Sequence, residues 1–426
     1  MSTAPTIALW TALAASLAAG CIADRVVTVD ARAPADSLGS TRTSESYIQG
    51  QSKLDVLFVI DNTTGMPAVQ DALIAGIGGF IDRLELARAQ WRIGVISSDL
   101  GISPFSGPGC MSLGGDGAAL QNLARIPGCT PPTARYITRT NVADPRAAFA
   151  CIARLGDAGC GFEQPLAAAL KAIDPQRMPA VNQGFLRDDA LLMVVVVSNE
   201  DDCSAAQSAL YDPDDLSYGP WTSYRCFAHG ITCQGGVGPG GLTGCASGGP
   251  QLLGVNAAAK QLRALAPAGT PVLVALVGPS APVKVTGSGV ATTVGPSCSS
   301  AKVQATPAIR IGELVDAFGA DGVRVSVCSA GLGYGLAQAT GRLRTSTGPY
   351  CLRHALEDPG SPACAVSVQT AAKTWLVPPG GPGEAGFHLV HPLVPGCEHG
   401  ALDFDAAARP PAGARVTVTC DFASSP

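Results

Sequence analysis

LDVLFVIDNTTGM, residues 54–66, joins an unbroken apolar run from Val56 to Ile60 to a polar loop that begins at Asp61. A short run of β-branched and large apolar residues that ends in turn residues predicts a strand buried on both faces. Apolar residues then recur at three- and four-residue spacing between Val69 and Leu84, which predicts a helix. The polar loop therefore leads from the carboxyl end of a buried strand into a helix, where open α/β sheets bind ligands.

This strand, loop and helix resemble the first loop of the von Willebrand factor A (vWA) domain, in particular the bacterial lipoprotein branch of that family. The family phrase is Asp-x-Ser-x-Ser, and it holds Mg²⁺ or a similar ion at a metal-ion-dependent adhesion site. Asp61 matches the Asp and Thr63 matches the first Ser, whereas Gly65 stands where the second Ser belongs. The resemblance implies a vWA-like domain over residues 53–348.

The resemblance also implies two further loops at the same site. In CGFEQPLAAAL, residues 160–170, Glu163 stands near the position of a family Thr. In VVVVSNEDDCS, residues 194–204, Asn199 stands where the family has Asp. The implied metal ligands, in a degenerate site, are Asp61, Thr63, Glu163 and Asn199. The residues implied to assist binding are Asn62, Gly65, Glu200, Asp201 and Asp202.

The chemistry of this ligand set leaves two interpretations open. One carboxylate and one hydroxyl are few ligands for Mg²⁺, which needs near-octahedral oxygen ligands. Glu163 would add a second carboxylate and shift the preference towards Ca²⁺ or Mn²⁺. The alternative is the remnant of a lost site, in which Asp61 caps the helix and the acidic residues are solvated.

Length and charge limit the classes of function. A chain of 426 residues has room for two or three domains, and its net charge of −5 gives no basis for binding nucleic acid. Residues 1–20 carry no charge and read as a secretion signal. The signal ends LAAGC, which resembles a lipobox, so Cys21 is the expected lipidation site and Ile22 favours the outer membrane; an ordinary cleaved signal is the alternative. Lipid would be the only membrane contact, and residues 21–52 are expected to be a disordered tether.

The fourteen cysteines after Cys21 predict disulfides. An even number in an exported chain favours disulfides over zinc, because the sequence contains no Cys-x-x-Cys and its histidines do not cluster. The pairing cannot be deduced from spacing.

Alternation of strand and helix patterns predicts an α/β fold, a mainly parallel sheet flanked by helices on both faces. The strands expected after the first are residues 91–98, 135–140, 190–197, 271–277 and 323–327. The helices expected after the first are residues 144–155, 252–265, 307–318 and 332–343. Residues 160–166 are expected to lead into one more helix, which runs through Ile173. Disulfide-rich insertions are expected at about 100–133 and 205–249, with a polar loop or hairpin over 281–301. Residues 349–426 are expected to be a small Cys-rich β extension.

The expected function is that of an exported, lipid-anchored binding or adhesion protein without enzymatic activity, whose partner is a protein or a glycan. That step is analogy, since fold alone does not determine function. One alternative is an envelope hydrolase that uses the loop Glu200-Asp201-Asp202, although hydrolysis needs two carboxylates facing one substrate. Another is a structural surface protein with an inert site. The aromatic group Tyr218, Trp221 and Tyr224 predicts either a contact patch or loop packing.

Overall fold

The structure, a computed structural model, describes residues 26–27, 42–50, 53–87, 89–125, 127–267, 271–329, 331–340, 349–358, 363–380, 384–390, 397 and 399–423. The predicted signal, Cys21 and most of the predicted tether lie outside the described residues. In the described part of the chain, no helix has the length and apolarity that a membrane crossing requires.

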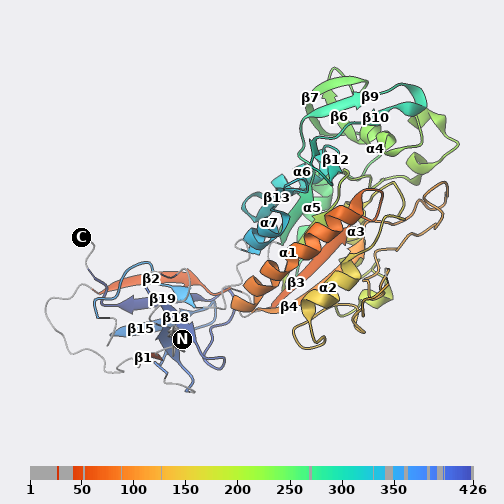
Figure 1. Cartoon of the computed structure of the whole chain (residues 1–426). Coiled ribbons are helices and arrows are strands. Elements are labelled where there is room, and N and C mark those ends of the chain that lie inside the picture. Colours follow the sequence, from red (N-terminus) through yellow and green to blue (C-terminus); the bar gives the residue numbers. More distant parts are fainter. Residues whose placement is uncertain are drawn as a thin grey trace, which may run out of the picture.

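Five parallel strands form the central sheet, as the apolar runs predict (Figure 1). Their order is β13-β8-β5-β3-β4, and every neighbouring pair is parallel. The bounds are β3 (Lys53–Ile60), β4 (Gln90–Ser97), β5 (Leu191–Val197), β8 (Val272–Val277) and β13 (Gly322–Ser326). The chain crosses from β4 on one side of β3 to β5 on the other, so β3 lies at the switch point of the sheet.

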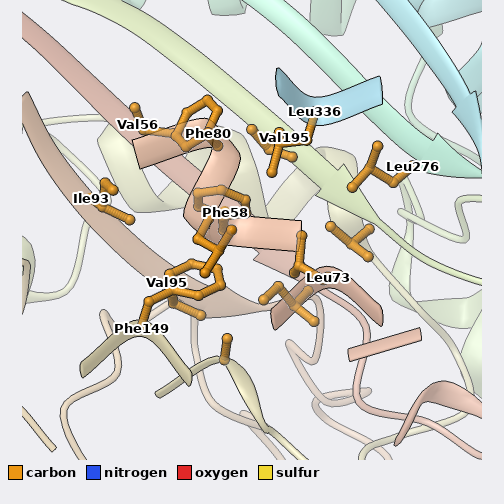
Figure 2. Close-up of a cluster of buried hydrophobic side chains, with 14 of the residues drawn as sticks. Val56, Phe58, Leu73, Phe80, Ile93, Val95, Phe149, Val195, Leu276 and Leu336 are labelled. Carbon is orange, nitrogen blue, oxygen red and sulfur yellow. The ribbon is translucent and has the colours of Figure 1, made fainter. Parts of the chain in front are cut away.

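Helices cover both faces of this sheet. They are α1 (Met66–Leu86), α2 (Pro145–Ala153), α3 (Pro165–Ile173), α5 (Val255–Leu265), α6 (Ile309–Ala317) and α7 (Leu332–Ala339). Alternate residues of β3 enter different cores: Phe58 packs with α1, α2 and α7, whereas Leu57 packs with α3, α5 and α6. Figure 2 shows Phe58 between Phe80 and Phe149, with ring centroids 6.1 and 4.9 Å away. The strand is therefore buried on both faces, as predicted.

The prediction of a strand at residues 135–140 is wrong. Only an isolated antiparallel bridge forms there, in which Ile93 and Ile137 exchange backbone hydrogen bonds of 2.9 and 2.8 Å. The Asn141 side chain then turns the chain, because it accepts from the Thr138 N–H and donates to the Tyr136 carbonyl, each at 2.8 Å.

The insertion at 205–249 is more regular than its Gly-rich sequence indicates. It contains η2 (Ser208–Tyr211), η3 (Leu216–Tyr218), α4 (Ser223–Gly230), β6 (Ile231–Gln234) and β7 (Gly240–Ser247). The hairpin expected within 281–301 forms from β9 (Val283–Thr286) and β10 (Thr293–Val294), and it extends the β6–β7 pair into a four-stranded sheet. The remaining short elements are η1 (Ala180–Asn182), η4 (Gly289–Ala291), β11 (Cys298–Ser299), β12 (Gln304–Ala305) and η5 (Gly319–Asp321).

The C-terminal residues form a β module of two four-stranded sheets, β16-β15-β19-β2 and β1-β17-β18-β14. Its strands are β1 (Val26–Val27), β2 (Thr43–Ile48), β14 (Tyr350–Cys351), β15 (Cys364–Gln369), β16 (Thr374–Val377), β17 (Phe387–Val390), β18 (Ala401–Phe404) and β19 (Arg415–Cys420). The module has its own core, which includes Val366, Phe387 and Val418. In Figure 1 it lies at one end of the α/β unit, and the β6–β7–β9–β10 sheet lies at the other.

The end of the predicted tether is a strand of this module, which corrects the prediction of disorder for residues 43–48. β2 pairs with β19 over six residues. Glu45 is buried, and its carboxylate accepts from the backbone N–H groups of Arg353 and His354 at 2.9–3.0 Å. Tyr47 stacks on Tyr350 with 4.1 Å between ring centroids. The module is thus built from both ends of the described chain.

Disulfides account for all fourteen cysteines after Cys21, which confirms the prediction. The pairs are Cys110–Cys160, Cys129–Cys151, Cys203–Cys226, Cys233–Cys245, Cys298–Cys328, Cys351–Cys397 and Cys364–Cys420. Both cysteines of the 100–133 insertion pair with residues outside it. Seven disulfides are typical of an oxidising compartment, which indicates an extracellular or envelope protein.

Candidate functional site

The loops that follow β3 and β5 lie side by side at the carboxyl edge of the sheet. The two strands pair in parallel up to Ile60 and Val197, and the Asp61 N–H donates to the Val197 carbonyl at 2.9 Å. The prediction that Asp61 and the loop after Val197 share one rim of the sheet is therefore confirmed. We call this rim, with the loop that carries Glu163, the crest.

Asp61 organises the crest through three short hydrogen bonds. Its Oδ1 accepts from the Thr63 N–H at 2.8 Å and from the Thr63 hydroxyl at 2.6 Å, and its Oδ2 accepts from the Ser198 hydroxyl at 2.6 Å. The side chain has no exposed surface. Burial raises the pKa of Asp61, although the hydrogen bonds from Ser198 and Thr63 act in the opposite direction.

Glu163 brings a second buried carboxyl to Asp61. It precedes α3, is 1% exposed, and is close enough to the Asp61 carboxylate for the two groups to interact electrostatically. Its Oε2 accepts from the Ser98 hydroxyl, and its Oε1 has no hydrogen-bond partner among the described residues. Burial first, and the Asp61 carboxylate second, raise the pKa of Glu163 well above its usual range. Two adjacent buried carboxyls without a countercharge favour either a shared proton or a bound cation.

Asn199 explains why residue 65 is a glycine. The Asn199 amide nitrogen donates to the Thr64 carbonyl at 3.3 Å, which leaves its buried Oδ1 without a partner in the described part of the chain. A Cβ on Gly65 would lie 2.9 Å from this amide nitrogen, and Gly65 has a φ of +91°, which a side chain would strain. The place of the second family Ser is thus filled by an amide from another loop.

Gln70 on α1 fixes the Asp61 loop to the loop that leads to Glu163. Its amide nitrogen donates to the carbonyls of Asp61 and Gly156 at 3.0 and 2.9 Å, and its amide oxygen accepts from the Gly156 N–H at 3.1 Å. A further tie is the hydrogen bond from the Gly159 N–H to the Asn62 carbonyl, at 2.8 Å. Asn62 itself is buried against Gly159, where a Cβ would meet the Asn62 Oδ1 at 2.4 Å.

Asp201 and Asp202, which were predicted to assist binding, make structural contacts with two helices. The Asp201 carboxylate accepts from the first backbone N–H groups of α6 at 2.9–3.1 Å and so caps that helix. Asp202 forms a buried ion pair with Arg310, at 3.1 Å, and accepts from the Leu166 N–H in the first turn of α3. Their carboxylates are thus occupied by helices α3 and α6.

Glu200 is half-buried, and burial followed by the Asp61 charge raises its pKa from 4.5 to about 7. Because the folded pKa lies above the unfolded value, protonation stabilises the fold. This contribution is complete below about pH 4.5 and is lost as the pH rises through about 7. We expect Glu200→Gln to remove up to about 2 kcal/mol from the difference in unfolding free energy between pH 5.5 and 7.5.

Urea unfolding in a chelator at both pH values measures this difference. Glu357→Gln, at an exposed residue of the β module, is the matched control and should leave it unchanged. Equal pH dependence in the wild type and Glu200→Gln would contradict the assignment.

Ser98, Ser198 and Gln70 belong to the crest but were not predicted as site residues. Ser98 and Ser198 directly follow β4 and β5, so their position after two apolar runs was an available signal. Gln70 lies on the buried face of a helix, where a polar residue needs a partner. The aromatic residues pack against the protein in two clusters. The Trp221 and Phe162 ring centroids are 5.3 Å apart in a cluster that also includes Tyr218, and Tyr224 stacks on Phe227 in a second cluster.

The residues present fit an oxygen-coordinated cation. Six buried side-chain atoms of the described residues have no hydrogen-bond partner, and three of them are crest oxygens. These three are Asn62 Oδ1, Glu163 Oε1 and Asn199 Oδ1. Within the described ranges, no group of three or more His, Cys, Asp or Glu side chains has a metal-binding arrangement, so amide and hydroxyl oxygens would have to complete any site.

Comparison with known proteins gives distant matches of structure only. No protein-family model and no curated protein matches the sequence. The open conformation of the pilus adhesin SpaC from Lactobacillus rhamnosus GG is 12% identical, with a TM-score of 0.33 over 87% of this chain and 39% of that one. A second crystal structure of SpaC is 10% identical, with a TM-score of 0.30 over 87% and 40% of the two chains. Human COPII-coat protein Sec24c is 8% identical, with a TM-score of 0.29 over 90% and 42%. The chain spans about two fifths of the length of these structures.

Proposed function

We propose that the chain is an exported vWA-like binding protein that holds a divalent cation at the crest and there engages a protein or glycan partner. The observation that carries this proposal is a pair of unpartnered buried oxygens on two loops of the crest: Glu163 Oε1, on a carboxyl that interacts with the Asp61 carboxylate, and Asn199 Oδ1, on the loop after β5. An unpartnered buried acceptor costs about 1–3 kcal/mol, and a cation would remove that cost at both atoms.

The topology of the sheet supports the vWA-like assignment. The loop after β3 leaves the sheet at its switch point, where ligands of open α/β sheets bind. The antiparallel Ile93–Ile137 bridge stands at the β4 edge, outside the five parallel strands. The insertions follow the carboxyl ends of β4, β5 and β8, so they surround the crest rather than the opposite edge.

A binding role suits the crest better than hydrolysis. Asp201 and Asp202 already serve α6 and α3, so the predicted acidic loop offers only Glu200. Asp61 and Glu163 are each at most 1% exposed, so a substrate bond could not lie between them, whereas a partner could contact the exposed part of the crest at Thr64 and Gly65. The seven disulfides suit an exported protein, and lipidation of Cys21 with outer-membrane attachment completes the proposal.

Calorimetry of the oxidised chain with Ca²⁺, Mg²⁺ and Mn²⁺ tests the cation. We expect saturable binding that Asp61→Asn abolishes, because the amide removes the central charge and keeps the shape. Asp82→Asn is the control. Asp82 lies on α1 in an exposed ion pair with Arg146, so this variant should bind the cations as the wild type does. Absence of binding with all three ions would contradict the proposal. A turnover lost in Glu200→Gln but kept in Asp61→Asn would favour the hydrolase.

A further inference from the structure

We infer that the cation of the crest is Ca²⁺, and that Glu163 and Asn199 select it over Mg²⁺. This inference rests on the proposed function, because it names the ion of the same site. It is carried by the type of the free donor atoms, by their burial and by the rigidity of the loops that hold them.

The free donors are oxygens of the kinds that bind Ca²⁺. Glu163 offers a carboxylate oxygen and Asn199 an amide oxygen, both unpartnered in the described structure. Thr63 spends its hydroxyl hydrogen on Asp61, which leaves its oxygen lone pairs available, whereas the Ser198 hydroxyl oxygen already accepts from the Glu200 N–H at 2.9 Å. No nitrogen or sulfur ligand is needed, so the set is typical of a hard cation.

The burial of these residues favours Ca²⁺ over Mg²⁺. Asp61, Glu163 and Ser198 are each at most 1% exposed, so an ion bound among them must give up most of its water. Mg²⁺ loses water reluctantly and usually keeps several water ligands, whereas Ca²⁺ accepts six to eight oxygens from carboxylates, amides and carbonyls in a flexible geometry. A crest made of protein oxygens with little room for water therefore favours Ca²⁺.

The loops that carry these donors have little freedom to contract around a smaller ion. Gln70 ties the Asp61 loop to Gly156, and the Cys203 N–H donates to the Glu163 carbonyl at 2.7 Å. Asn199 is held from both sides, since its amide donates to Thr64 and its carbonyl accepts from the Thr306 N–H at 2.9 Å. Ca²⁺ ligands stand at about 2.3–2.6 Å and Mg²⁺ ligands at about 2.0–2.1 Å, so a rigid site does not serve both ions equally.

Competition calorimetry on the oxidised chain tests the selection, with CaCl₂ titrated in the absence and presence of MgCl₂. We expect Ca²⁺ to bind at least about tenfold more tightly than Mg²⁺. Glu163→Gln and Asn199→Ala should each weaken Ca²⁺ about 10–100-fold and reduce the Ca²⁺-dependent rise in melting temperature. Asp71→Asn, at an exposed ion pair on α1, is the control and should change neither quantity.

The outcomes separate this inference from the proposed function. Mg²⁺ binding as tight as Ca²⁺ binding would overturn the selection and leave a cation site at the crest. No binding of either ion by the wild type would overturn both. Circular dichroism in chelator confirms that each variant is folded; Glu163→Gln replaces a buried carboxyl beside another carboxyl by a neutral amide and should fold at least as well as the wild type.

Discussion

Asp202→Ala is expected to lower the free energy of unfolding by about 3–5 kcal/mol, one of the largest effects of a single substitution in this chain. The Asp202 carboxylate is fully buried and pairs at 3.1 Å with an Arg310 guanidinium that is 3% exposed. Its removal would leave a buried cation without a countercharge, and it would also remove the acceptor for the Leu166 N–H at the start of α3. Urea unfolding at pH 7 measures the loss.

A matched control lies on α6, the helix that carries Arg310. Asp316 and Arg324 form an ion pair whose side chains are 60% and 40% exposed, so Asp316→Ala should cost less than about 1 kcal/mol. The double variant Asp202→Leu with Arg310→Met should be more stable than Asp202→Ala alone, because it leaves no buried charge unpaired. Equal costs for Asp202→Ala and Asp316→Ala would show that the buried pair does not have the assigned role.

The sequence predicts the frame of the crest well. The buried runs that end at Ile60 and Val197 imply neighbouring parallel strands, and parallel strands bring their carboxyl ends to one edge. A strand that is buried on both faces has apolar residues at consecutive positions, and such an unbroken run is a strong signal in the sequence. The positions of Asp61, Thr63 and Asn199 follow directly from those two strand ends.

The contacts made across long sequence separations could not be predicted. Asp201 caps a helix that begins at Ile309, and no local pattern links the two. The same holds for β2, whose sequence TSESYI has few apolar residues and becomes a strand because β19 supplies its partner. The predicted strand at 135–140 fails for the opposite reason, since a local Asn141 turn overrides an alternating pattern. Tertiary context decided the first two cases, and local turn chemistry decided the third.

Replacing both Cys110 and Cys160 by serine is expected to lower the free energy of unfolding by about 2–4 kcal/mol and to weaken cation binding. The disulfide closes a sequence separation of 50 residues, and a long closed loop restricts the unfolded chain strongly. Cys160 lies three residues before Glu163, so the bond also holds the loop that carries the second carboxyl. Urea unfolding and Ca²⁺ calorimetry of the same preparation measure the two effects.

Removal of the Cys233–Cys245 disulfide distinguishes the effect on stability from the effect on cation binding. It closes a sequence separation of only 12 residues within the β6–β7 hairpin. In the chain-entropy description, its removal should therefore lower the free energy of unfolding by about 1 kcal/mol less than removal of Cys110–Cys160. Both cysteines pack in the hydrophobic cluster of Phe227, Val283 and Val285, apart from the Asp61, Glu163 and Asn199 loops in sequence, and cation affinity should therefore be unchanged. Loss of affinity in both double variants would mean that the insertions act on the crest as one unit. Retained affinity without Cys110–Cys160 would mean that Gln70 and the Cys203 N–H alone hold Glu163 in place.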